Sequence, residues 1–132
     1  MNSLNLPNPK LMDIAVPKNK KHGVSLETQM QSNGINVQQL KTMIGQKVVK
    51  LIDVRENFEI QRDGLIENSI HVPYAQIENF FKNIELPQPN EKFVLYCHTG
   101  QRTYLALLKL KNSNIHHLAG GILNWIKAGE SV

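Results

Sequence analysis

The sequence predicts an α/β protein in which helices cover both faces of a parallel sheet. Short runs of β-branched and other apolar residues, such as KVVKLIDV (47–54), have the composition of strands that are buried on both faces. Segments with apolar residues at helical spacing separate these runs, so strands and helices alternate along the chain. The chain has 132 residues, of which 41% are hydrophobic and 20% are charged, and this composition suits one globular domain.

The N-terminal segment, residues 1–33, has no sustained hydrophobic period. It contains three prolines, several asparagines and the basic cluster KNKKH (18–22), which we interpret as part of a solvated tether. The pattern becomes regular from Gly34 onward. We therefore predict an N-terminal arm or linker at 1–33 and one domain at 34–132.

The first half of this domain predicts three helices and two strands. The helix at 36–44 has an apolar face, and Asn36 is placed to cap its N-terminus. That face consists of Val37, Leu40, Met43 and Ile44. The other elements are the strand at 47–54, a short helix at 57–63 that ends at Gly64, a short strand at 69–73 and a helix at 74–84.

The second half predicts two strands and two helices. KFVLYC (92–97) has the composition of another buried strand, and NIHHL (114–118) is a further clear one. We expect the helix between them, at 100–112, to turn Leu105, Leu107 and Leu108 inward. GGILNWIKAGE (120–130) predicts the last helix.

The only cysteine, Cys97, ends the strand at 92–97, just before a predicted helix. Ligands of open α/β sheets bind beyond such strand ends. Backbone N–H groups of residues 99–102, together with the helix N-terminus, are expected to form a cradle that stabilises a thiolate. Gly100 lets the backbone approach the sulfur, and Arg102 offers a planar fork of donors to an oxyanion. We therefore interpret Cys97 as an activated nucleophile rather than an inert buried thiol.

Three motifs follow one another in order: LIDVRENFEI (51–60), YCHTGQRT (96–103) and HLAGGILNWIKAG (117–129). Together they resemble a single-domain rhodanese of the sulfurtransferase family, over roughly residues 35–129. The resemblance implies a rhodanese-like fold with a parallel sheet of about five strands and helices on both faces. It also implies a reaction in which Cys97 accepts a sulfane sulfur from a donor such as thiosulfate, holds it as a persulfide and passes it to a thiophilic acceptor.

The resemblance also implies roles for the residues around Cys97. The backbone amides of residues 98–102 hold the persulfide sulfur, while Arg102 steadies the loop or the anionic donor. His98, Thr99, Gly100 and Gln101 complete the binding loop, where the side chains shape the substrate pocket. Asp53 and Arg55 support the loop through an ion pair or hydrogen bonds, and Thr103 keeps the hydroxyl of a common serine. The segment GLIENS (64–69) departs from the family pattern, and we expect Asn68 to take the left-handed conformation there.

Two other functions are compatible with this chain. A docking or regulatory module could retain the fold without catalysis, although such a module needs neither Cys97 nor Arg102. A cysteine phosphatase or arsenate reductase-type enzyme could use the same thiolate. Cysteine phosphatases, however, place the arginine six residues after the cysteine, whereas Arg102 is five residues after Cys97. The tighter ring of amides favours a single sulfur atom over a phosphoryl group.

The sequence predicts no cofactor and no metal. His116 and His117 are adjacent in a predicted strand, so their side chains leave opposite faces, and no second cysteine completes a zinc site. His71 is interpreted as structural, whereas a protonated His98 would stabilise a thiolate or an anionic donor. With no second cysteine to form an internal disulfide, the sulfur acceptor must be a small thiol or a thiol on another protein.

The charge pattern and hydropathy exclude several other partners. The formal net charge is +4, but aromatic and basic residues do not interleave, so we expect no nucleic-acid binding. No run approaches the roughly 18 apolar residues of a membrane span, and the N-terminus lacks the pattern of a signal peptide. We predict a cytoplasmic protein that does not bind membranes.

Overall fold

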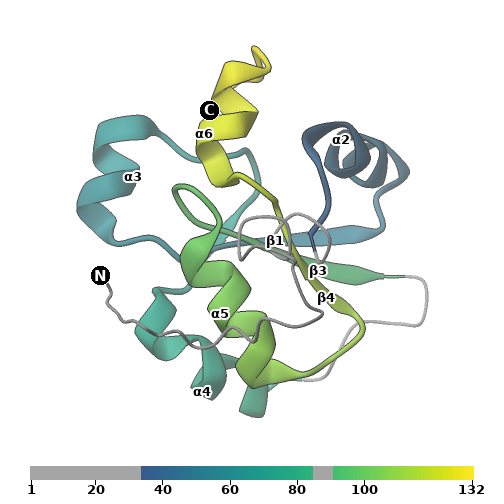
Figure 1. Cartoon of the computed structure of the whole chain (residues 1–132), viewed down its shortest axis with the longest axis vertical. Coiled ribbons are helices and arrows are strands. Elements are labelled where there is room, and N and C mark those ends of the chain that lie inside the picture. Colours follow the sequence, from purple (N-terminus) through teal and green to yellow (C-terminus); the bar gives the residue numbers. More distant parts are fainter. Residues whose placement is uncertain (1–33, 85–90) are drawn as a thin grey trace, which may run out of the picture.

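The computed structural model describes residues 34–84 and 91–132, so the predictions for the arm at 1–33 lie outside the described residues. The described residues form a parallel sheet of strand order β2-β1-β3-β4 with helices around it (Figure 1). The strands are β1 (Val49–Asp53), β2 (Ile70–His71), β3 (Lys92–Tyr96) and β4 (Ile115–His117). The helices are α2 (Val37–Gln46), α3 (Asn57–Asp63), α4 (Ile77–Lys82), α5 (Gln101–Leu110) and α6 (Gly121–Lys127), and a short 3-10 helix, η1 (Tyr74–Gln76), precedes α4.

The register of the strands brings their carboxyl ends to one edge of the sheet. Asp53 at the end of β1 pairs with Tyr96 at the end of β3, and Leu95 pairs with His117 at the end of β4. All three pairings are parallel, as predicted from the alternation of strands and helices. The loops that follow these strand ends therefore meet at the same edge.

The two faces of the sheet carry separate hydrophobic clusters. Successive side chains of a strand point to opposite faces, and in β3 the residues Phe93, Leu95 and the following Cys97 pack on the side of α4 and α5. Val94 and Tyr96 pack on the other side with residues of α2 and α6. Figure 1 shows α4 and α5 below the sheet and α2 and α6 above it. The prediction of helices on both faces is thus confirmed.

The strand count differs slightly from the predicted value. The described residues form a sheet of four strands instead of about five. Beyond β4 lies a single parallel bridge between Ile35 and Leu118. The bridge cannot lengthen toward the C-terminus because the next residue, Asn36, is already the N-cap of α2.

Several local predictions for the first half are confirmed. Asn36 and Gln39 form a reciprocal capping box: the Asn36 side chain accepts from Gln39 N at 2.8 Å, and the Gln39 side chain accepts from Asn36 N at 2.7 Å. Helix α3 ends at Gly64, whose φ is 82°. Asn68 has a φ of 69°, so it adopts the left-handed conformation that was expected to replace glycine.

The inward face of α5 was predicted correctly for Leu107 and wrongly for Leu105 and Leu108. Leu105 and Leu108 are 48% and 52% exposed. The side chains that turn toward the sheet are Thr103, Tyr104 and Ala106, which are buried, and Leu107 and Leu110, which pack against the core. Six of the seven residues at 104–110 are apolar, so the helix has more than one apolar stripe at helical spacing. The spacing alone does not show which stripe faces the sheet. On α2, similarly, Leu40 is buried, but Ile44 is 37% exposed.

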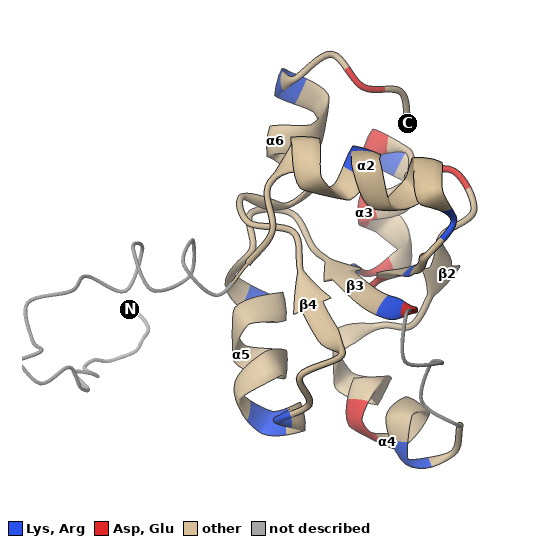
Figure 2. Cartoon of the chain, turned by 90° about the vertical axis from the view of Figure 1, so that its right-hand side faces the viewer, with Lys and Arg blue, Asp and Glu red and all other residues tan. Residues whose placement is uncertain are grey.

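Charged residues of both signs are distributed over the helices and loops. Figure 2 shows basic and acidic residues on several elements, without a broad stripe of one sign on the face in view. No helix in the described ranges, 34–84 and 91–132, is long and apolar enough to cross a membrane.

Candidate active site

Cys97 directly follows β3 and lies on the side of the sheet that α5 covers. The residue is only 1% exposed. The backbone N–H of Gly100 donates a hydrogen bond to Cys97 Sγ at 3.1 Å, and Thr103 Oγ1 lies 3.7 Å from the same sulfur. The cysteine is therefore buried against polar groups as well as apolar ones, and at least one main-chain donor is directed at it.

The loop between β3 and α5 depends on the conformation of Gly100. Gly100 is the N-cap of α5 and has a φ of 101°, in a region that L-residues rarely occupy. A Cβ atom at this position would also lie 3.2 Å from Gly120 N. The glycine thus allows the chain to turn sharply enough to direct its own N–H at the sulfur.

The N-terminus of α6 holds the other side of this loop. Ile122 N donates to Cys97 O at 2.9 Å, and Leu123 N donates to His98 O at 3.1 Å. These donors belong to the first turn of a helix, where backbone N–H groups have no partner within the helix. A Cβ atom on Gly121 would lie 2.3 Å from His98 O, so only glycine lets the helix approach this closely. Gly121, the first residue of α6, is therefore part of the site.

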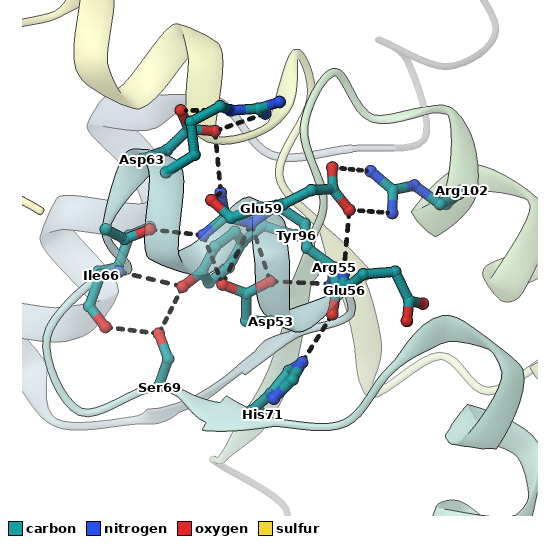
Figure 3. A network of polar contacts seen from close by, with 12 residues as sticks. Asp53, Arg55, Glu56, Glu59, Asp63, Ile66, Ser69, His71, Tyr96 and Arg102 are labelled. Atoms are coloured by element: carbon teal, nitrogen blue, oxygen red, sulfur yellow. Dashed lines mark hydrogen bonds and ion pairs between the residues drawn. The ribbon is translucent and has the colours of Figure 1, made fainter.

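Arg102 does not point an open guanidinium at the sulfur. Its two terminal nitrogens each donate to a carboxylate oxygen of Glu59 at 2.8 Å (Figure 3). These hydrogen bonds lower the pKa of Glu59 from 4.5 to about 2, against the opposing effect of burial. Each terminal nitrogen therefore uses one of its two N–H groups on Glu59, and this pair holds the start of α5 against α3.

Glu59 was not identified from the sequence. It lies on α3 and is 7% exposed, which is low for a glutamate. The signal available was its position, four residues after Arg55 in the motif at 51–60. Its partner, however, is 43 residues further along the chain, and nothing local indicates that pairing.

Asp53 and Arg55 form a buried ion pair below α3. Arg55 Nη2 lies 2.8 Å from Asp53 Oδ2, and both side chains are 0% exposed. Arg55 Nη2 also donates to Gly64 O at 2.6 Å, and Nη1 donates to Glu59 O at 3.4 Å. Figure 3 shows that this network joins the end of β1 to both ends of α3. The pair therefore fixes the helix that carries Glu59.

Tyr96 ties the segment 64–69 to the same network. The Tyr96 hydroxyl accepts from Ile66 N at 3.0 Å and lies 2.8 Å from Ser69 Oγ. The Arg55 guanidinium carbon lies 5.8 Å from the centre of the Tyr96 ring. The segment that departs from the family pattern thus keeps a defined position beside the site.

Thr103 connects Cys97 to His117, a histidine for which the sequence predicts no functional role. Thr103 Oγ1 lies 2.9 Å from His117 Nδ1 and donates to Gly100 O at 3.2 Å. Thr103 and His117 are both 0% exposed. His117 has the same parity in β4 as Ile115, so it faces α5, whereas His116 faces the opposite side. The alternation was predicted, but a partner for His117 on α5 was not.

The remaining loop residues and histidines have separate surroundings. Thr99 and Gln101 are exposed, and His98 is partly exposed. Within the described ranges, the buried Nδ1 atom of His98 has no hydrogen-bond partner. His71 Nε2 lies 2.6 Å from Arg55 O, which fits the structural role predicted for it. In the part of the chain that the structure describes, no three His, Cys, Asp or Glu residues form a group that could bind a metal.

The chain is similar to proteins that share this arrangement of strands, loop and helices. Residues 36–128 match the family described as Rhodanese-like domain. A relative from Mus musculus, thiosulfate sulfurtransferase/rhodanese-like domain-containing protein 3, is 26% identical over 106 residues, which cover 70% of this chain and 68% of the relative. Among solved structures, a rhodanese-related protein from Thermoplasma volcanium has a TM-score of 0.62 and 32% identity, with 75% of this chain and 95% of that chain covered.

Another relative has a different name. A tRNA uridine(34) hydroxylase from Wolbachia is 31% identical over 117 residues, which cover 80% of this chain and 41% of that protein. This chain therefore spans less than half of the hydroxylase. The similarity concerns a part of that protein and does not transfer its whole activity.

Proposed function

Because the chain belongs to the rhodanese-like domain family, we propose that it is a sulfurtransferase that carries a sulfane sulfur on Cys97. The hydrogen bond from Gly100 N–H to Cys97 Sγ is the observation that supports this most directly. A main-chain donor at 3.1 Å stabilises negative charge on the sulfur. The position after a parallel strand and before α5 is also where α/β proteins bind their ligands.

The proposed reaction has two steps. In the first, the Cys97 thiolate attacks the outer sulfur of thiosulfate; an S–S bond to Sγ forms, the bond to the sulfite sulfur breaks, and sulfite leaves with the electron pair. In the second, the acceptor attacks the terminal sulfur of the persulfide, and Cys97 leaves as a thiolate. A thiol acceptor becomes a persulfide, and cyanide becomes thiocyanate. The enzyme returns to its starting state without any oxidant or reductant.

The burial of Cys97 sets a condition on this reaction. With 1% exposure, the residue meets a sulfur donor only when the loop around it moves aside. Loop residues 98–101 include the exposed Thr99 and Gln101, and movements of this kind are common at active sites. A donor that reaches the sulfur in this way then lies close to His98, Thr99 and Gln101.

The acceptor is external in this proposal. Cys97 is the only cysteine of the chain, so the persulfide cannot be resolved by an internal disulfide. A small thiol or a thiol on another protein is then required. A reducing, cytoplasmic location suits both this acceptor and a free catalytic thiol.

A coupled test uses thiosulfate as donor and cyanide as acceptor. The wild-type protein is expected to form thiocyanate, and Cys97→Ala is expected to form none. Intact mass spectrometry after thiosulfate alone should show a species about 32 Da heavier, which a reductant removes. A wild-type protein that forms neither thiocyanate nor the heavier species would contradict the proposal and would favour a docking or regulatory module.

Phosphatase-type chemistry at the same thiolate is less well supported. A cysteine phosphatase needs a guanidinium directed at the phosphoryl oxygens, whereas two of the five N–H donors of Arg102 bind Glu59 and Arg102 is one residue closer to the cysteine than in those enzymes. Turnover of an aryl phosphate by the wild-type protein, lost in Cys97→Ser, would favour that reaction instead.

A further inference from the structure

Three buried side chains, one directly after β3, one on α5 and one on β4, form a line of polar contacts that ends at the proposed nucleophile. Cys97 Sγ lies 3.7 Å from Thr103 Oγ1, which lies 2.9 Å from His117 Nδ1. The three residues are 1%, 0% and 0% exposed, so water does not compete for these contacts. Polar groups buried to this degree need partners, and the choice of partner controls where each proton lies.

The protons can be counted around the Thr103 hydroxyl. The oxygen has one proton to donate and two lone pairs that accept. Its three neighbours are Gly100 O, His117 Nδ1 and Cys97 Sγ. Gly100 O can only accept, and a Cys97 thiolate can only accept. Both would compete for the single hydroxyl proton.

The tautomer of His117 decides that competition. If Nδ1 carries no proton, it is a third acceptor, and at 2.9 Å it is the nearest of the three. The hydroxyl proton is then held by the imidazole, and the sulfur receives none. If Nδ1 carries a proton, it donates to Oγ1, and the hydroxyl proton is free for Gly100 O or for Sγ. Gly100 O already accepts a hydrogen bond from Tyr104 N at 3.0 Å, so an anionic sulfur is the stronger acceptor for the hydroxyl proton.

We propose that His117, as the Nδ1–H tautomer, orients the Thr103 hydroxyl so that it donates to the Cys97 thiolate. Thr103 and His117 are then positioning residues for the sulfurtransferase reaction, and this inference rests on the proposed function for its catalytic meaning. The thiolate receives two donors, Gly100 N–H and the Thr103 hydroxyl. Cys97 is a thiolate both when it attacks the donor and when it leaves the persulfide, so both steps benefit.

The guanidinium of Arg102, the charged group near these contacts, is balanced by a carboxylate. The positive charge of Arg102 interacts with Cys97, but the same guanidinium is bound to the Glu59 carboxylate. A local donor such as the Thr103 hydroxyl therefore has more influence on the thiolate than in a site with an unpaired arginine. The Tyr104 ring also lies near the His117 ring, with the two centroids 6.3 Å apart.

The test measures the thiolate directly, without any sulfur donor. Because Cys97 is the only cysteine, the ultraviolet absorbance of thiolate, taken as the difference from Cys97→Ser, reports on this one sulfur as the pH is raised. Thr103→Val keeps the shape and removes the hydroxyl, and it is expected to reduce the thiolate-to-thiol ratio about tenfold, because one hydrogen bond to a charged group is lost. Thr103→Ser keeps the hydroxyl and is expected to stay close to wild type.

The histidine is tested by rescue and by combination. His117→Phe removes the donor and is expected to reduce the ratio by a similar factor. His117→Asn returns an amide N–H near the position of Nδ1 but cannot hold a transferred proton, and it is expected to restore most of the ratio. In the Thr103→Val background, His117→Phe should add almost nothing, because the histidine acts through the hydroxyl. His116→Phe, on the opposite face of β4, is the matched control and should leave the ratio unchanged.

Several results would overturn the inference. A thiolate ratio in Thr103→Val equal to that of wild type removes the hydroxyl as a donor. Additive effects of the two substitutions, or no recovery in His117→Asn, exclude the orienting role and favour direct proton transfer or a packing effect. Circular dichroism and thermal unfolding of each variant show whether a change of stability accompanies the change of ratio. Thiocyanate formation is measured separately, so failure of the sulfurtransferase proposal is distinguishable from failure of this one.

Discussion

The two terminal nitrogens of Arg102 bind the two carboxylate oxygens of Glu59 at 2.8 Å each. Glu59 is fixed by α3, and Arg102 is in the first turn of α5, so this contact joins two helices whose residues are 43 positions apart. A bidentate pair of this kind restricts both the distance and the angle between its partners. The pair therefore sets the position of the helix whose first residues form the loop around Cys97.

Arg102→Lys should reduce the rate of sulfur transfer by about tenfold or more, because a lysine cannot make the bidentate pair and the loop loses its fixed position. The measurement is thiocyanate formation from thiosulfate and cyanide, with kcat and KM determined separately. Arg62→Lys is the matched control, since Arg62 pairs with Asp63 and is 54% exposed. Equal activity of Arg102→Lys and wild type would show that the pair is dispensable.

The same pair predicts a dependence of stability on pH. The pKa of Glu59 is lowered from 4.5 to about 2, mainly by its hydrogen bonds with Arg102. The folded state therefore holds the proton less tightly than the unfolded state. The stabilisation is complete above about pH 4.5 and is lost as the pH falls toward 2, by up to about 3 kcal/mol.

Glu59→Gln removes the titrating group and is the variant that checks this dependence. Urea unfolding is measured at a series of pH values between neutrality and the acid range. The wild-type protein should lose stability relative to Glu59→Gln as the pH falls, so the difference between the two should shrink. A difference that stays constant over this range would mean that Glu59 has an ordinary pKa.

Asp53→Asn should destabilise the protein by about 3–5 kcal/mol, because it removes the nearer and fully buried counter-ion of Arg55 and leaves only the partly exposed Asp63, at 3.4 Å. Both side chains of the pair are 0% exposed, so water cannot replace the lost carboxylate. Denaturant unfolding gives the free energy. Asp63→Asn serves as comparison, since Asp63 is partly exposed, pairs mainly with the exposed Arg62 and contacts Arg55 only at 3.4 Å; a smaller loss, of about 1 kcal/mol, is expected.

The sequence predicted the features that depend on nearby residues. The end of β3 and the start of α5 bracket Cys97 because an apolar run, a glycine and a helical pattern follow one another within a few positions. Asn68 was expected in the left-handed region because asparagine can take the place of the glycine that the family pattern has there, and its φ is 69°.

The features that it missed depend on residues far apart in the chain. Arg102 binds Glu59, and Thr103 contacts His117, only because the packing of α5 brings these residues together. The inward face of α5 could not be chosen from its leucines, since Leu105 and Leu108 are exposed and Thr103 and Ala106 are buried. With Leu105 and Leu108 taken as inward, nothing in the sequence placed Thr103 between Cys97 and His117.

The approach of α6 to the cysteine loop gives a last prediction. Gly121 has a φ of 66°, and a Cβ atom there would lie 2.3 Å from His98 O and 2.7 Å from Cys97 O. Gly121→Ala should therefore destabilise the protein by about 2–5 kcal/mol, through backbone strain and a clash with main-chain atoms that cannot rotate away.

The same substitution should also slow sulfur transfer, because relief of the clash moves the loop that directs Gly100 N–H at Cys97 Sγ. The measurements are urea unfolding and thiocyanate formation. Gly45→Ala is the matched control: Gly45 lies in α2, and a Cβ there would have no neighbour within 4 Å. That change should stabilise the protein by about 0.5–1 kcal/mol and leave activity unchanged, because alanine favours the helix. If Gly121→Ala were as stable and as active as Gly45→Ala, close contact between α6 and the loop would not be required for the site.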